Sequence, residues 1–380
     1  MKPPRVLIAD DQPHVLDALE LLLKNEGFAP EAVNSPRAVV EAVQDCRFDV
    51  LLLDMNYARD TTSGGEGLEL LSRIRELDSA LPVVLMTAWG SIELAVEAMQ
   101  SGGRDFVQKP WDNQKLLVSL RRHIEEGRLL REKKQRERAS ERMLQEMHEA
   151  RDIQRRLLPV ELPHLSGRDI QAFWQPAGEV GGDYFDAIRL SPASAALCIA
   201  DVAGKGLPAA LLMSNMQASV RGFAQNTASP AEMCRQLNRI VLDTCSGRFA
   251  TLFYAVLDSA AGALRYTNAG HVPPILVRND GAVLRLSEGG TVLGVFADAP
   301  YEEAQVTFET GDRLVLITDG ITEAANESGE DFGEDRFIRL LVENRDLPAA
   351  ELREVLLDAL ANFTGQGLQD DATLMIVSPA

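Results

Sequence analysis

The 380-residue chain has few of the features that mark several common protein classes. Its 4 cysteines (Cys46, Cys198, Cys234 and Cys245) form no CxxC pair. We therefore expect reduced, mostly buried cysteines, with no disulfide framework and no zinc site.

Long apolar runs and excess positive charge are also missing. No apolar run reaches about 18 residues, so no membrane-spanning helix is expected. The chain begins Met-Lys-Pro-Pro and enters an apolar strand without a signal-peptide hydrophobic region. We therefore expect a cytoplasmic protein without a membrane partner. The net charge of −19 argues against nucleic acid as the main partner.

The length predicts two domains, and residues 1–124 have the pattern of the first. Short apolar runs that predict buried strands lie at 6–9, 50–53, 83–86 and 106–107. Stretches with helical spacing lie at 15–23, 68–74, 92–99 and from 116 onward. Strands that are apolar on both faces and alternate with helices predict an α/β domain with a parallel sheet.

Residues 125–158 are expected to form a helical linker. The segment 131–142 is almost wholly charged or polar, so it cannot be a core helix. Apolar residues return at three- and four-residue steps from Met143 to Leu157, and Pro159 ends the pattern. The spacing fits either a parallel coiled coil, which would make the protein a homodimer, or a solvated single helix.

Residues 159–380 are rich in strand-like runs and predict an α+β layered domain. The strand-like runs lie at 195–200, 249–257, 264–268, 275–277, 314–317 and 373–377. The helical stretches lie at 207–223, 230–242, 335–342 and 349–363.

Polar residues follow the strands of the first domain. Asp10, Asp11 and Asp54 come at the carboxyl ends of two strands, Thr87 follows the next strand, and Lys109 follows the last. Ligands of a parallel sheet bind at the carboxyl ends of its strands. Clustered carboxylates repel one another unless a cation joins them, and Mg²⁺ suits such oxygen ligands.

This constellation resembles the response-regulator receiver family over residues 4–124. The resemblance implies a flavodoxin-like, five-stranded parallel sheet and a sensor histidine kinase as partner. It makes Asp54 the phospho-acceptor, with Thr87 and Lys109 contacting the phosphoryl group and Phe106 as an aromatic switch. The implied Mg²⁺ ligands are Asp10, Asp11, Asp54 and the Asn56 carbonyl. The loop at 55–65 is longer than usual and lacks the usual Met-Pro.

The second domain contains four short acidic motifs, and each of them follows or opens an apolar strand. They are Gly-Gly-Asp at 181–183, Ala-Asp-Val-Ala-Gly-Lys-Gly at 200–206, Thr-Asp-Gly at 318–320 and Gln-Asp-Asp-Ala-Thr at 369–373. Each alone is more typical of a turn. Together, four converging carboxylates call for about two divalent cations, which can activate a water for in-line attack on phosphorus.

These motifs resemble the PPM (PP2C-like) phosphatases, in particular their SpoIIE/RsbU-type branch, over residues 145–378. Further matching stretches are Gly-Gly-Asp-Tyr-Phe-Asp at 181–186, Asn-Ala-Gly-His-Val-Pro-Pro at 268–274 and the lead-in at 150–159. The resemblance implies a PP2C-like β-sandwich flanked by helices. It also implies hydrolysis of phosphoserine or phosphothreonine esters by water at two Mn²⁺ or Mg²⁺ ions, without a phosphoenzyme.

The resemblance also implies metal-ligand roles. Asp201 would bridge both ions and the Val202 carbonyl would bind one of them. Asp183 would bind the second ion, and Asp319 and Asp370 would complete the first. Asp371 is either a ligand or a residue that supports the ligands.

Two departures from the family pattern limit this assignment. Lys205 stands where related enzymes often have His, so no general acid is assigned, and no phosphate-gripping Arg is identified. His271, in a Gly-His-x-Pro-Pro turn, is interpreted as structural rather than catalytic. The Gly-Gly-Asp-Tyr-Phe stretch is only superficially like a GGDEF cyclase signature, because the residues after it do not fit.

The sequence thus predicts a response regulator with a metal-dependent phosphatase output that aspartyl phosphorylation controls. The expected substrate is a STAS-type anti-sigma-factor antagonist in partner switching. The alternative is a catalytically weak or inactive adaptor that binds a sigma factor or its regulator, and the complete carboxylate set favours the enzyme. The linker helix is expected to pass the signal to the helix at 207–223, with its direction left open.

Overall fold

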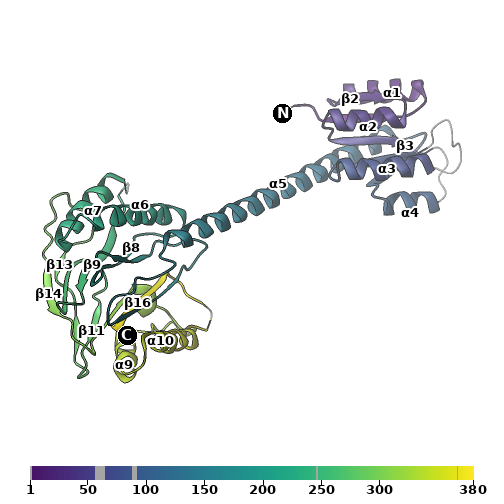
Figure 1. The fold of residues 1–380 in the computed structure, drawn as a ribbon. Helices are drawn as coiled ribbons and strands as arrows, with labels where there is room; N and C mark the ends of the chain where they lie inside the picture. Colours follow the sequence, from purple (N-terminus) through teal and green to yellow (C-terminus); the bar gives the residue numbers. More distant parts are fainter. Residues whose placement is uncertain (1, 56–64, 88–91, 245–246, 366) are drawn as a thin grey trace. The chain divides into compact units, whose positions relative to one another are not determined.

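The computed structural model describes residues 2–55, 65–87, 92–244, 247–365 and 367–380 (Figure 1). Contacts divide the chain into two compact units, Met1–Met143 and Leu144–Ala380. Within the described ranges, no helix has both the length and the apolar character to cross a membrane.

The first unit contains a five-stranded parallel sheet in the order β2-β1-β3-β4-β5 (Figure 1). The strands are β1 (Arg5–Ala9), β2 (Ala29–Val33), β3 (Val50–Asp54), β4 (Val83–Thr87) and β5 (Asp105–Gln108). The helices are α1 (Pro13–Asn25), α2 (Pro36–Asp45), α3 (Gly65–Leu77), α4 (Ile92–Gln100) and the start of α5 (Asn113–Leu157). This order confirms the predicted flavodoxin-like fold.

Alternating side chains of the central strands form two cores, one on each face of the sheet. Leu51 and Leu53 pack in one cluster with α2 and α3, whereas Val50 and Leu52 pack in the other with α1 and α5. Because successive strand side chains point to opposite faces, a strand buried on both sides must be apolar throughout. The strand order reverses at β1, so the crevice of the sheet opens at the carboxyl ends of β1 and β3.

Helix α5 begins in the first unit and ends in the second. Its first turns contribute Leu116 and Leu120 to the receiver core. Gly127 does not interrupt the helix: a Cβ there would lie 2.6 Å from the Pro82 ring, so the glycine allows close packing. One turn later, Arg131 donates to the Phe48 carbonyl oxygen at 2.8 Å. From residue 135 to 146 the helix is exposed.

The second unit contains two predominantly antiparallel sheets. One is formed by β7 (Tyr184–Arg189), β8 (Ser194–Val202), β9 (Ala250–Asp258), β10 (Ala263–Ala269), β13 (Gly289–Gly290) and β14 (Ala304–Thr307). The other is formed by β6 (Arg168–Gln175), β11 (Ile275–Val277), β12 (Val283–Arg285), β15 (Arg313–Ile317) and β16 (Ala372–Pro379). The helices are α6 (Leu207–Ala224), α7 (Pro230–Thr244), α8 (Asp319–Thr322), α9 (Glu334–Glu343) and α10 (Ala349–Thr364).

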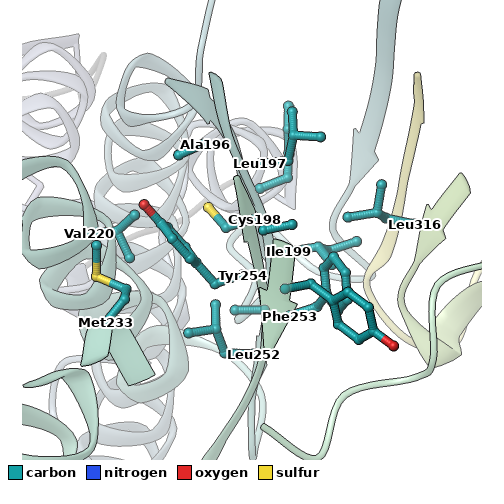
Figure 2. Packing of buried hydrophobic residues seen from close by; sticks show 14 of the residues in the cluster. Ala196, Leu197, Cys198, Ile199, Val220, Met233, Leu252, Phe253, Tyr254 and Leu316 are labelled. Atoms are coloured by element: carbon teal, nitrogen blue, oxygen red, sulfur yellow. The ribbon is translucent and has the colours of Figure 1, made fainter. Parts of the chain in front are cut away.

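The two sheets pack face to face, and helices cover both outer faces. Figure 2 shows Cys198 and Tyr254 on the side of α6 and α7, and Ile199 and Phe253 on the side of Leu316 from the other sheet. The outer face of that second sheet packs on α9 and α10. Each fully buried Leu, Ile or Phe contributes about 1.5–3 kcal/mol of burial free energy. The layers confirm the predicted PP2C-like sandwich flanked by helices.

Candidate functional site

Three carboxylates meet at the crevice of the receiver sheet. Asp10, Asp11 and Asp54 offer ligand atoms that all lie within 4.8 Å of one another. The Lys109 ammonium lies 2.5 Å from an Asp10 oxygen and 3.1 Å from an Asp54 oxygen. The neighbouring strands β1 and β3 run parallel, so the residues at their carboxyl ends share one edge. One ammonium does not balance three carboxylates, and the excess negative charge fits Mg²⁺.

Two buried polar atoms of this site have no hydrogen-bond partner in the part of the chain that the structure describes. They are Asp11 Oδ1 and the Thr87 hydroxyl. Buried polar atoms are rarely left unpaired, so both are suited to an incoming ligand. Phe106 on β5 is 53% exposed. Asn56, the remaining predicted ligand, lies outside the described residues.

The second unit holds Asp183 in a turn that precedes β7. Its side chain is 1% exposed, and one oxygen, Oδ2, accepts hydrogen bonds from Thr318 at 2.8 Å and Thr373 at 2.6 Å. Burial, and then the charge of Asp201, raise the pKa of Asp183 well above its usual value. Because both hydroxyls go to the same oxygen, the other oxygen remains available to a metal ion.

The three other carboxylates are electrostatically coupled. Burial, followed by the charges of Asp319 and Asp370, raises the pKa of Asp201 to about 7. Burial, followed by Asp370, raises the pKa of Asp319. Asp201 lies near the end of β8, and Asp319 opens α8 directly after β15. These raised pKa values mean that the folded protein holds like charges close together. A divalent cation bound between the carboxylates would relieve their repulsion.

The carboxylates of the second unit are spaced more widely than those of the first. Among the described residues, only the receiver cluster brings three such ligand atoms within 4.8 Å. Two ions about 3.5–4 Å apart spread their ligands over a larger volume than one ion does. The wider spacing is therefore compatible with a two-metal site.

The carboxylate of Asp371 is engaged by the backbone. It accepts hydrogen bonds from the Ala177 N–H at 2.8 Å and the Gly182 N–H at 2.6 Å. A Cβ on Gly320 would lie 2.0 Å from the Asp371 carbonyl oxygen, so only glycine fits there. Of the two roles left open by the sequence, this geometry favours the supporting one, in which Asp371 anchors the turn that carries Asp183.

One cation stands beside Asp370, and a second borders the loop that follows Asp201. Lys205 pairs with Asp370 at 3.0 Å and donates to the Gln369 carbonyl at 2.9 Å, while its side chain stays 64% exposed. A Cβ on Gly204 would lie 3.5 Å from the Arg248 Nε, so this guanidinium borders the Asp201 loop. Pairing of β8 with β9 brings Arg248 there across a long stretch of sequence. Sequence reasoning missed it because no motif surrounds it.

The C-terminal end of α5 contacts the parts of the second unit that lie next to Asp183 and the Asp201 loop. The Gln154 side chain is 3% exposed, donates to the Gly181 carbonyl at 2.7 Å and accepts from the Gly181 N–H at 3.0 Å. Gln217 of α6 donates to the Leu157 carbonyl at 2.9 Å. Arg151 pairs with Glu179 at 3.3 Å. The helix therefore holds both the turn before Asp183 and the helix that follows the Asp201 loop.

The fold and the two carboxylate sites define a class of protein with a receiver unit and a PP2C-like unit, and comparisons with known proteins agree. Residues 6–121 match the model of the response regulator receiver domain, and residues 191–379 match that of stage II sporulation protein E (SpoIIE). The phosphoserine phosphatase RsbU of Bacillus subtilis is 32% identical over 235 residues, which cover 61% of this chain and 69% of RsbU.

Two further relatives support the assignment. Protein IcfG of Synechocystis is 29% identical over 261 residues, 61% of this chain but only 41% of IcfG. The crystal structure of the RsbU and RsbW domains of Rv1364c from Mycobacterium tuberculosis has a TM-score of 0.53 at 28% identity. It covers 59% of this chain and 63% of that one. The chain belongs to the SpoIIE/RsbU family of PP2C-like phosphatases and carries a response-regulator receiver domain.

Proposed function

We propose that this protein is a response regulator whose output is a metal-dependent protein serine/threonine phosphatase. The observation that carries the proposal is the coupled carboxylate set of the second unit: Asp183, Asp201, Asp319 and Asp370. An adaptor that needs no metal has no use for mutually repelling carboxylates, of which Asp183 is buried and Asp201 and Asp319 are half-buried. The proposed domain limits are 1–124 for the receiver, 125–158 for the linker and 159–380 for the phosphatase.

Each protein group has a role in this proposal. The carboxylates of Asp183, Asp201, Asp319 and Asp370, with the Val202 carbonyl, would hold two Mn²⁺ or Mg²⁺ ions. When bound, such ions supply a water of lowered pKa and neutralise charge on the phosphate. Lys205 and Arg248 offer positive charge at the rim, where they can draw an anionic phosphate toward the carboxylates. Asp371 and the two threonines on Asp183 hold the ligands in place.

The receiver would take its phosphoryl group from a sensor histidine kinase. Asp54 would attack the phosphorus of a phosphohistidine, so that the P–N bond breaks and a P–O bond to the carboxylate forms. Lys109, 3.1 Å from Asp54, offsets charge on the product. The unpaired Thr87 hydroxyl can donate to the phosphoryl group. Asp10 and Asp11 would hold the Mg²⁺ that this transfer requires.

Control by the receiver would pass along α5. The sequence suggested that the signal reaches the helix at 207–223, and the Gln217 bond to Leu157 supports that contact. The Gln154 bonds to Gly181 add a shorter route to the turn that carries Asp183. A homodimer formed through the linker would let phosphorylation change the position of this helix end.

The proposed substrate is a phosphoserine on a STAS-type anti-sigma-factor antagonist in a partner-switching pathway. The support is the similarity to RsbU, whose name describes a phosphoserine phosphatase. A phosphorylated STAS-type protein should lose phosphate in the presence of this enzyme and Mn²⁺, and a phosphotyrosine peptide should not.

The first test is hydrolysis of p-nitrophenyl phosphate with Mn²⁺, by wild type and Asp319→Asn, each with and without beryllofluoride. We expect metal-dependent turnover that Asp319→Asn abolishes and beryllofluoride changes. Folded protein without turnover under every condition would favour the adaptor instead, and a search for a sigma-factor partner would follow.

A further inference from the structure

His271 is a buried side chain whose polar atoms are all engaged. It is 5% exposed. Its Nδ1 lies 2.8 Å from the Thr251 hydroxyl, and its Nε2 lies 3.1 Å from the Ile317 carbonyl oxygen. Its backbone is held by Asn268, which accepts from the His271 N–H and donates to the His271 carbonyl.

These partners determine the tautomer of the imidazole. A carbonyl oxygen can only accept, so Nε2 carries the hydrogen and donates to Ile317. Nδ1 is then an acceptor, and the Thr251 hydroxyl donates to it at 2.8 Å, while the same hydroxyl lies 3.5 Å from the Asp201 carbonyl oxygen. Burial lowers the pKa of His271 to about 4, in agreement with a neutral ring. With both nitrogens occupied, His271 has no free atom for proton transfer to a substrate.

The two partners of the ring belong to different sheets. Thr251 lies on β9, directly opposite Asp201 on β8. Ile317 is the last residue of β15, two positions before Asp319. His271 itself lies between β10 of one sheet and β11 of the other. The chain Thr251–His271–Ile317 therefore joins the two sheets beside two of the carboxylates proposed as metal ligands.

We propose that His271 is a positioning residue that, together with Thr251, sets the separation of Asp201 and Asp319 and so the metal affinity of the phosphatase site. The inference rests on the proposed function for the identity of the site. Sheet packing alone is non-directional and tolerates small sliding movements. Two hydrogen bonds of fixed direction, one of them buried and the other partly buried, restrict such movement. Supporting side chains of this kind typically change metal affinity 10–100-fold when they are removed.

The test measures Mn²⁺ affinity from the electron paramagnetic resonance signal of free Mn²⁺, on the full chain with Asp11→Asn to remove the receiver site. Thr251→Val keeps the shape and removes the hydroxyl, and we expect it to weaken Mn²⁺ binding at least about 10-fold. Thr251→Ser retains the hydroxyl and should stay within about 2-fold of the parent. His271→Gln can still donate to Ile317 but loses the Thr251 bond. Combined with Thr251→Val, it should add little further loss.

Thr267→Val is the matched control. Thr267 is a buried threonine on β10 whose hydroxyl donates to the Glu302 carbonyl at 2.9 Å instead of to the His271 ring. We expect it to lower thermal stability and leave Mn²⁺ affinity unchanged. If Thr251→Val and His271→Gln also lower thermal stability without changing Mn²⁺ affinity, the positioning role is overturned.

The outcomes also separate this inference from the proposed function. Weakened Mn²⁺ binding in Thr251→Val, in a protein that hydrolyses no phosphate ester, would support the positioning role and contradict the enzyme. Absence of Mn²⁺ binding by the parent protein would overturn both.

Discussion

The raised pKa of Asp201 ties the stability of the metal-free protein to pH. A carboxyl group with a higher pKa when folded binds more protons in the folded state, so stability falls as pH rises through the interval between the two pKa values. For Asp201, this interval runs from its ordinary value of 3.8 to about 7.

We therefore expect the metal-free protein to melt at a lower temperature at pH 8 than at pH 5.5. Saturating Mn²⁺ should raise the melting temperature more at pH 8, because binding the ion requires the deprotonated carboxylate. Differential scanning fluorimetry of wild type and Asp201→Asn measures both effects. An equal pH response in Asp201→Asn would assign the effect to other groups.

Gly320 is a second position where one residue controls the site. A Cβ there would lie 2.0 Å from the Asp371 carbonyl oxygen. Because this oxygen belongs to the backbone, it cannot move away without displacing the turn. We expect Gly320→Ala to displace the turn at Asp370 and Asp371, abolish phosphatase turnover and lower the melting temperature.

Gly222→Ala is the control for this prediction. Gly222 lies in α6, and a Cβ there meets no atom within 4 Å. Alanine should stabilise the helix by about 0.5–1 kcal/mol and leave turnover unchanged. Turnover close to wild type in Gly320→Ala would show that the turn adapts.

At the scale of elements, the end of α5 supports the turn that carries Asp183. Gln154→Leu keeps the size of a buried side chain and removes both hydrogen bonds to Gly181. Leaving a buried backbone group without a partner costs about 1–3 kcal/mol. We expect lower stability and a higher Mn²⁺ concentration at half-maximal turnover, measured by titration of the p-nitrophenyl phosphate assay.

Gln145→Leu tests the same substitution on the exposed part of α5. Gln145 bonds only to Glu149 of the same helix, at 3.4 Å, among the described residues. Its removal should leave the metal requirement unchanged. Equal Mn²⁺ concentrations at half-maximal turnover for Gln154→Leu and Gln145→Leu would show that the end of α5 does not affect the metal site.

For the whole molecule, the continuity of α5 is the feature that can carry a signal. Ala139 lies within the exposed part of this helix. Proline inside a helix removes a backbone hydrogen bond and costs about 3 kcal/mol or more. We expect Ala139→Pro to retain basal phosphatase turnover and to lose the change in turnover that beryllofluoride causes in wild type.

Ala139→Ser keeps the helix and should retain the response to beryllofluoride. The binding of beryllofluoride itself should be equal in both variants. The change in intrinsic tryptophan fluorescence can report it, because Trp111 follows Lys109 by two residues. A full response in Ala139→Pro would contradict control through a continuous helix.

The sequence by itself determined the order of the domains, the class of each fold and the candidate carboxylates. Apolar runs and helical spacing are local properties, because the side-chain period of a strand or helix acts over a few residues. The motifs around Asp54, Asp201 and Asp319 are equally local, since each carboxylate lies at or directly after the end of a strand.

Only the tertiary structure decided how these residues are held. It assigned the Asp371 carboxylate to two backbone N–H groups, joined Gln154 to Gly181, and brought Arg248 beside the Asp201 loop. It also showed that His271 joins two sheets. These contacts connect segments from about twenty to nearly two hundred residues apart. They depend on strand register and sheet packing, which the free energy of the whole fold sets and no local pattern of side chains encodes.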